Sequence, residues 1–190
     1  MSKKLSAIMT FLILIPLILT TYDGDDEPDC LEPVDPSTLP EAYELDAEAS
    51  FESGLTYAYP SAWELTEVSG SVHEFDIPDA PGVFVRVVDT EQLVALGFPE
   101  TVGSNESDFD AYVEEFYGEA RTTNFASGTI GARQFMGGGL ALSCEGEANI
   151  AMYDSVAETI VTLDVLSEAG PIPDVMDEAR ADINGSLQGR

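Results

Sequence analysis

The strongest constraint on the fold is the stretch around the only tryptophan of the chain, Trp63. Before it, Leu55, Tyr57 and Tyr59 alternate with small or polar residues, and this period of two predicts a half-buried strand. Pro60 has no N–H to donate to a sheet, so it ends the strand, and a second short strand is expected to start near Trp63. Because a large ring just past a turn suits the corner of a core, we expect Trp63 to be a core residue and not a ligand platform.

Residues 1–22 are predicted to be an export signal. Lys3 and Lys4 precede an almost wholly apolar run over residues 5–19, as in a signal peptide. The run is shorter than the roughly 20 residues that a membrane-spanning helix needs. No A-x-A cleavage site follows, so an uncleaved N-terminal anchor is the alternative. In both cases the lysines before the run and the acidic residues after it predict an extracytoplasmic protein, secreted or anchored by this segment.

Residues 23–45 are predicted to be an acidic, proline-rich tether. Five acidic residues crowd between Asp23 and Asp29, and four prolines stiffen the segment. The cluster does not fit the calcium loop of an EF-hand, because Pro28 stands at the sixth position from Asp23, where glycine is required. We therefore expect a solvated spacer and no metal site.

The chain contains two cysteines, Cys30 and Cys144. In an exported protein they could form one disulfide, and they are equally compatible with two separate thiols. The sequence does not show whether the two Cα atoms approach closely enough for a bond.

The acidic charge limits the partners of this protein. Its formal net charge is −29, from 36 acidic and 7 basic residues, and no lysine follows Lys4. Such a surface repels phosphate backbones and anionic lipid, so nucleic acid is excluded as a partner and the membrane is contacted only through an uncleaved N-terminal segment. The hydrophobic share of 44% excludes general disorder. Two alternative explanations account for this charge: adaptation to concentrated salt, or a fresh-water host whose genome favours arginine over lysine.

From residue 46 to residue 190 the pattern is that of a globular domain. Residues 83–88 form the strongest predicted strand, and apolar side chains on both of its faces indicate a central position in a sheet. Residues 107–120 have an aromatic stripe at helical spacing, which predicts a helix packed on the sheet and not a ligand site. Further strands are expected over residues 72–77, 122–135, 148–153 and 158–166, the last two as a hairpin, and helices over 91–96 and 174–187.

No catalytic, cofactor-binding or metal-ligating residue is predicted. His73 is the only histidine, and its strand context indicates a surface or hydrogen-bonded residue and not a catalytic base. No G-x-S-x-G motif is present, and one histidine with two distant cysteines does not supply a zinc site. The run 137–139 of three glycines lacks the lysine and the serine or threonine of a phosphate-binding loop, and is interpreted as a turn or a strand kink.

The order of these elements resembles the PsbP-like family of exported domains. The resemblance lies in Gly54-Leu55-x-Tyr57-x-Tyr59-Pro60-x-x-Trp63 and in the C-terminal Ile183-Asn184-Gly185-Ser186-Leu187, and it covers about residues 48–189. It implies an antiparallel sheet with helices on both faces, and a role in binding or assembly. The family includes the extrinsic photosystem II subunit. That role is not implied here, because that subunit docks through basic residues, which this chain almost lacks.

We therefore expect an α+β domain over residues 46–190, with an antiparallel β-sheet flanked by helices on both faces in a PsbP-like sandwich. The expected function is that of a non-catalytic exported binding or accessory domain for an unknown protein or small-molecule partner, without a cofactor. The alternative is a carboxylate-dependent extracytoplasmic hydrolase. A pocket that brings two carboxylates together in an apolar setting would favour the hydrolase, and a filled domain with evenly spread acids would favour binding.

Overall fold

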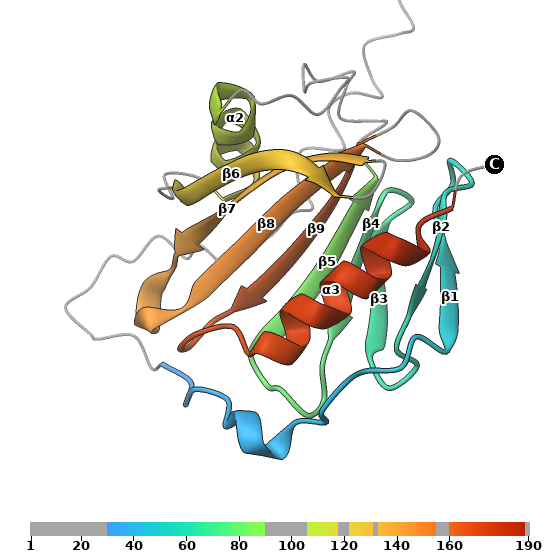
Figure 1. Ribbon diagram of the computed structural model, residues 1–190. Helices are drawn as coiled ribbons and strands as arrows, with labels where there is room; N and C mark the ends of the chain where they lie inside the picture. The colour runs from blue at the N-terminus through green and yellow to red at the C-terminus, as the bar shows by residue number, and fades with distance from the viewer. Residues whose placement is uncertain (1–29, 90–105, 118–121, 131–132, 155–159, 189–190) are drawn as a thin grey trace, which may run out of the picture.

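The computed structural model describes residues 30–89, 106–117, 122–130, 133–154 and 160–188 (Figure 1). Seven strands pair in the order β3-β4-β5-β9-β8-β7-β6, and β1 and β2 form a separate two-stranded sheet. The strands are β1 (Ala47–Ser50), β2 (Thr56–Tyr59), β3 (Glu64–Ser69), β4 (Val72–Asp76), β5 (Val83–Asp89), β6 (Thr122–Ile130), β7 (Arg133–Ala141), β8 (Glu147–Asp154) and β9 (Ile160–Ser167). The helices are α2 (Glu106–Tyr117) and α3 (Asp174–Ser186), with short 3-10 turns η2 (Pro36–Thr38) and η3 (Ser143–Glu145).

All neighbouring strands of the large sheet run antiparallel, so the predicted antiparallel sheet is confirmed. β5, expected to be a central strand, lies between β4 and β9. Its alternate residues Val83, Val85 and Val87 are completely or almost completely buried, whereas on the other face Phe84 and Arg86 are half-buried and Val88 is completely buried. The two faces of this part of the sheet therefore have different environments.

The predicted hairpin of β8 and β9 is also present, and its strands pair from Glu147 with Ser167 to Asp154 with Ile160. The glycine run 137–139 is not a turn, because all three residues pair in regular register with β8 inside β7. A Cβ atom at Gly137 would lie 2.5 Å from the carbonyl oxygen of Ile150. Glycine is therefore needed there for the close approach of two backbones.

Both long helices agree with their predicted positions over the part of the chain that the structure describes. α2 begins at Glu106 and α3 ends at Ser186. The predicted helix over residues 91–96 and the N-terminal segment 1–22 lie outside the described residues. None of the described helices has the length and apolar character that crossing a bilayer requires.

The domain has two hydrophobic cores. The first joins β2, β4, β5, β8, β9 and α3, and includes Trp63 and Phe75. The second joins α2 to β7 and β8 through Phe109 and Val113. Along β8, Ala151 contributes to the first core and its neighbour Ile150 to the second. Because neighbouring residues of a strand point to opposite faces, the two cores lie on opposite faces of β8.

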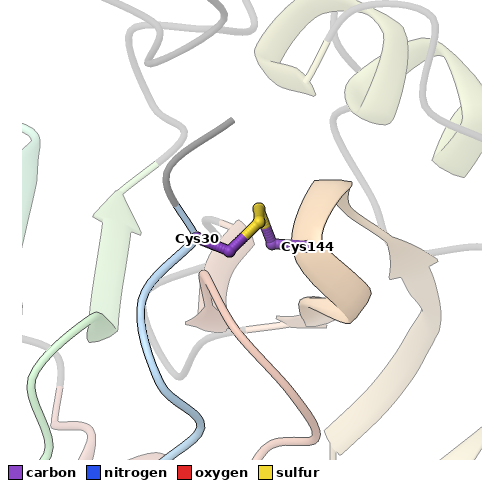
Figure 2. Close-up of a disulfide and its surroundings, with 2 residues drawn as sticks. All are labelled: Cys30 and Cys144. Atoms are coloured by element: carbon purple, nitrogen blue, oxygen red, sulfur yellow. A yellow bond between two sulfur atoms is a disulfide. The ribbon is translucent and has the colours of Figure 1, made fainter. Parts of the chain in front are cut away.

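Residues 30–45, which we call the N-terminal strap, lie against the domain. Val34, Leu39, Tyr43 and Leu45 pack against the first core. At its beginning Cys30 forms a disulfide with Cys144 in η3, with 5.6 Å between the Cα atoms (Figure 2). This part of the predicted tether is therefore not a free spacer, because a covalent bond and apolar contacts hold it to the domain. The domain boundary at residue 46 stays a prediction.

Candidate functional site

A row of charged side chains crosses the face of the sheet opposite the first core. Glu74 on β4 pairs with Arg86 on β5, and Arg86 pairs with Asp164 on β9. The Arg86 guanidinium donates hydrogen bonds from Nε and Nη2 to Oε2 of Glu74, at 3.1 and 2.7 Å. The side chains of Arg86 and Glu74 are only 20% and 29% exposed, so solvent screens this ion pair less than a surface pair.

Asp164 is completely buried in the middle of the sheet. An ionised carboxylate removed from water needs compensating charge or hydrogen bonds. In the strand register Arg86 is its direct neighbour on β5, on the same face, whereas its neighbour on β8 is the apolar Ile150. The row therefore places one arginine between two acidic residues.

Beside this row, two residues further along β4 and two residues back along β5, the surface forms a hollow of about 260 Å³, which we call the acidic hollow. Glu64 on β3 and Asp76 on β4 stand directly opposite each other in the register and line it. Its other walls include Pro78, Pro81 and Phe84. Directly opposed side chains on neighbouring antiparallel strands have Cβ atoms about 5 Å apart, so the two acidic side chains leave the sheet at neighbouring positions. The acidic hollow combines negative charge with apolar walls.

The acidic hollow suits the binding of a cation better than acid–base catalysis. Glycosidase-type carboxylate pairs need one carboxyl group in an apolar setting that keeps it protonated. Both Glu64 and Asp76 are exposed to solvent. Together they attract a positive charge, and the ring of Phe84 provides a surface on which the carbon atoms of a cationic ligand could pack.

His73 lies in the first core and not at this site. It is 4% exposed, its ring is stacked on Phe51 with 4.3 Å between centroids, and its Nδ1 shares a 2.7 Å hydrogen bond with the hydroxyl of Tyr57. Burial raises the pKa of Tyr57 above its ordinary value, and the neighbouring Tyr59 adds to the shift. The only histidine is therefore a hydrogen-bonded core residue.

Every arginine that the structure describes is engaged within the domain. Besides Arg86, Arg180 forms an ion pair with Asp177 at 3.1 Å, and Arg133 donates to the carbonyl oxygen of Leu187 at 2.8 Å. Within the described ranges, no group of three or more histidine, cysteine, aspartate or glutamate side chains is placed to hold a metal ion.

The sequence did not single out Glu64, Asp76 or Arg86. With 36 acidic residues in the chain, a pair of carboxylates is uninformative until strand pairing brings it together. One signal was available: Glu74 and Asp76 follow each other at a spacing of two within a predicted strand, which places both on one face.

The comparisons with known proteins concern the fold. No protein-family model matches this chain. No curated protein matches it either. Among solved structures, the solution structure of the cyanobacterial PsbP protein CyanoP from Synechocystis sp. PCC 6803 has a TM-score of 0.47 and 16% sequence identity, and the match covers 76% of this chain and 92% of that chain. The fold is similar to that of PsbP.

A second similarity is to a crystal structure from Bacteroides thetaiotaomicron VPI-5482, with a TM-score of 0.46 and 13% identity. The match covers 77% of this chain and 49% of the other, so this chain spans about half the length of that protein. At these identities and TM-scores the likeness is one of fold, and neither protein's function is carried over to this chain.

Proposed function

We propose that this chain is an exported, non-catalytic domain that binds a positively charged partner at the acidic hollow. The observation that supports the proposal best is the pair of opposed, exposed carboxylates of Glu64 and Asp76 beside apolar walls. A basic peptide side chain or an organic amine would place its charge at the carboxylates and its carbon atoms against Phe84 and Pro81.

The charge distribution of the rest of the domain supports the same class of partner. The three arginines of the described residues make contacts within the domain, and the 7 basic residues of the chain leave a net charge of −29 against its 36 acidic residues. A field of this sign attracts cations over long distances and raises the rate at which they reach the surface. The overall charge attracts any cation, and the acidic hollow provides a defined place on the surface where one can bind.

The test measures binding of a short fluorescent peptide that contains arginine and leucine, by fluorescence anisotropy, to the wild type and to two variants of equal charge. Glu64→Gln with Asp76→Asn removes both carboxylates of the acidic hollow. Glu178→Gln with Asp182→Asn removes two exposed carboxylates of α3. We expect the first variant to lose most of the affinity and the second to retain it. Equal losses would mean that only the overall charge attracts the peptide, which would overturn the proposal.

A pair of carboxylates is also the catalytic group of most glycoside hydrolases. The same variants therefore test the hydrolase alternative. Wild type and Glu64→Gln are incubated with chromogenic glycoside and ester substrates. Turnover by the wild type that is absent in Glu64→Gln would replace the binding proposal with the hydrolase. We expect no difference between the two proteins.

Two finer statements belong to this proposal. We infer that the sheet is sandwiched, with α3 on one face and α2 on the other, because Ala151 packs with the α3 core and Ile150 with the α2 core.

We also infer export through residues 1–22. The intact mass of the protein recovered outside the cytoplasm would show whether this segment has been removed, and recovery from the cytoplasm alone would contradict export.

A further inference from the structure

The N-terminal strap is attached to the domain mainly by its disulfide. None of residues 30–45 is fully buried, and the four that pack against the first core are half-buried. Among the described residues, the backbone of the strap makes hydrogen bonds only around η2. A segment with few buried contacts and no backbone hydrogen bonds to its neighbours opens at a low cost in free energy. The bond between Cys30 and Cys144 is therefore the strongest restraint on the strap.

The disulfide is accessible to a reductant, and the turn that carries it has a strained backbone. Cys30 is exposed and Cys144 is half-buried. In η3, Cys144 and Glu145 follow each other with φ angles of 59° and 58°. Residues with a Cβ atom disfavour this left-handed region, so the surrounding structure has to hold the turn in it. Cleavage of the bond removes one of the restraints that hold η3 in this conformation.

The strap packs against the loop that forms most of the acidic hollow. This loop, residues 77–82, joins β4 to β5, and all of its residues except Asp79 line the hollow. Leu31, the neighbour of Cys30, lies directly on it, since a Cβ atom at Gly82 would be 2.7 Å from Cδ1 of Leu31. The adjacent disulfide therefore fixes the position of Leu31, and Leu31 in turn restrains a wall of the hollow.

A second contact joins the strap to the same region. The ring of Tyr43 meets the indole of Trp63 edge-on, with 5.3 Å between centroids, and Trp63 directly precedes Glu64 of the acidic hollow. Burial and the charge of Asp79 raise the pKa of Tyr43, so this side chain also lies within electrostatic reach of loop 77–82. The strap therefore contacts the surroundings of the hollow at two points, one near its disulfide and one near its C-terminal end.

We propose that the disulfide between Cys30 and Cys144 is a redox switch that controls binding at the acidic hollow. In the oxidised protein the strap is closed, and Leu31 and Tyr43 hold loop 77–82 and its surroundings in place. Reduction opens the strap, loosens this loop and lowers the affinity of the hollow for a positively charged ligand. The inference rests on the proposed function of the hollow, and it adds the control of that function by thiols.

The switch operates by thiol–disulfide exchange with a dithiol reductant, either a small molecule or a protein with paired cysteines. A thiolate of the reductant attacks Sγ of Cys30, the more exposed partner, and Cys144 leaves as a thiolate that takes up a proton. The second thiol of the reductant then displaces Cys30, so the protein gains two electrons and two protons and the reductant becomes a disulfide. The reverse exchange, with a disulfide oxidant, closes the strap and is favoured outside the cytoplasm.

The rest of the domain is expected to stay folded when the strap opens. The first core contains completely buried residues of β5, β9 and α3, among them Val85, Leu163 and Met176, which do not belong to the strap. Local opening of a weakly attached segment does not require their contacts to break. This distinguishes a switch from a disulfide whose reduction simply unfolds the protein.

Hydrogen exchange tests the switch without a ligand, on the wild type before and after reduction with dithiothreitol. The amides of Ala80, Val83 and Glu168 donate to carbonyl groups of loop 77–82 at 2.9, 3.0 and 2.8 Å. We expect them to exchange about tenfold faster in the reduced protein, while amides of β8 and β9 keep their rates. Unchanged rates at all three amides would overturn the proposal. So would an equal acceleration in β8 and β9, which would show global unfolding.

Fluorescence follows the strap itself, because Trp63 is the only tryptophan and contacts Tyr43 of the strap. Reduction should shift its emission to longer wavelength as the buried indole meets water, and reoxidation should reverse the shift. An emission spectrum that does not respond to dithiothreitol would show that the strap stays closed, and would overturn the proposal.

Fluorescence anisotropy with the peptide that contains arginine and leucine measures the effect on binding. We expect the reduced wild type to bind about tenfold more weakly than the oxidised one, and reoxidation to restore the affinity. Cys30→Ser with Cys144→Ser is the matched control, which should bind as the reduced wild type does, with or without dithiothreitol. Reversible reduction of the wild type gives the same comparison if this variant fails to fold. Equal affinities of the oxidised and reduced wild type would overturn the proposal.

A peptide that binds neither the oxidised nor the reduced protein would overturn the proposed function of the hollow. The exchange rates of the loop amides and the emission of Trp63 are measured without peptide, so they would still show whether the disulfide controls the loop. The failure of the switch and the failure of the proposed function are therefore distinguishable.

Discussion

At the scale of the residue, the region around Trp63 is a closely packed aromatic core. The indole ring is 3% exposed and contacts Tyr43 edge-on at 5.3 Å and Phe75 at 5.9 Å between ring centroids. Its Nε1 has no hydrogen-bond partner among the described residues. The contribution of Trp63 to stability therefore comes mainly from packing and apolar burial.

Truncation of this ring should be among the most damaging substitutions in the domain. Trp63→Ala is expected to lower the free energy of unfolding by about 3–5 kcal/mol, because it removes buried surface and leaves a cavity. The control is Leu65→Ala, two residues away, where the side chain is 38% exposed and a loss of about 0.5 kcal/mol is expected. Urea unfolding of both variants gives the comparison. Equal midpoints would show that the indole does not belong to the core.

Tyr57 should make the protein sensitive to alkaline pH. Burial raises the pKa of its phenol in the folded state, whereas the unfolded value is about 10. The stabilisation is therefore fully present below about pH 10 and is lost as pH rises, since only the unfolded chain ionises readily. Tyr57→Phe should be less stable at neutral pH, because it loses the hydrogen bond to His73. It should also lose less stability than the wild type between about pH 9 and 11. The free energy of unfolding measured against pH decides this, and identical slopes would refute the assignment.

At the scale of the element, the C-terminal end of α3 depends on a residue from the sheet. The last turn of α3 has no basic residue, although its exposed carbonyl groups favour a positive charge. Arg133 on β7 supplies that charge. It donates from Nη1 to the backbone oxygen and to Oδ1 of Asn184, and from Nη2 to the backbone oxygen of Leu187. One guanidinium therefore holds the end of α3 to a strand near the β6 edge.

Loss of this guanidinium should weaken the attachment of α3. Arg133→Gln is expected to lower the free energy of unfolding by about 1.5–3 kcal/mol, the range for hydrogen bonds to charged groups. Arg133→Lys keeps the charge but not the planar fork that reaches two carbonyl groups, so an intermediate loss is expected. Thermal unfolding measures both variants. A wild-type melting temperature in Arg133→Gln would contradict this role.

The N-terminal strap depends on its disulfide. Cys30 and Cys144 are separated by 114 residues in the sequence, and closing a loop of this length stabilises by about 4–5 kcal/mol in the chain-entropy model. Replacement of both cysteines by serine should lower the free energy of unfolding by up to about this amount. Intact mass with and without reductant and alkylation should show two protected thiols in the wild type. Two freely alkylated cysteines, or an unchanged unfolding midpoint in the double variant, would contradict the bond's role.

At the scale of the whole molecule, the excess of acidic residues predicts that salt controls stability. Self-repulsion opposes the compact state, and salt reduces the screening length from about 10 Å at 0.1 M to about 3 Å at 1 M. The hypothesis of adaptation to concentrated salt predicts a melting temperature that keeps rising into the molar range. Thermal melts at about 0.1, 0.5 and 2 M KCl test it. A melting temperature that is constant above about 0.5 M would indicate ordinary screening in an acidic protein.

The sequence by itself determined the local features of this fold. The alternation of Leu55, Tyr57 and Tyr59 indicated a strand, Pro60 its end, and the stripe over residues 107–120 a helix, because each depends on residues close together in the chain. The core position of Trp63 also followed from its immediate neighbours. These features were predictable because backbone geometry and period act over a few residues.

The tertiary structure alone decided what depends on distant partners. The three glycines at 137–139 are compatible with a turn or a strand kink in the sequence, and the pairing with β8 decides against the turn by placing them inside a strand. The sequence could not choose between a disulfide and two thiols, because the distance from Cys30 to Cys144 is set by the packing of the strap. The opposition of Glu64 and Asp76 likewise exists only in the register of β3 and β4. Pairing between strands is a contact between segments that no local period specifies.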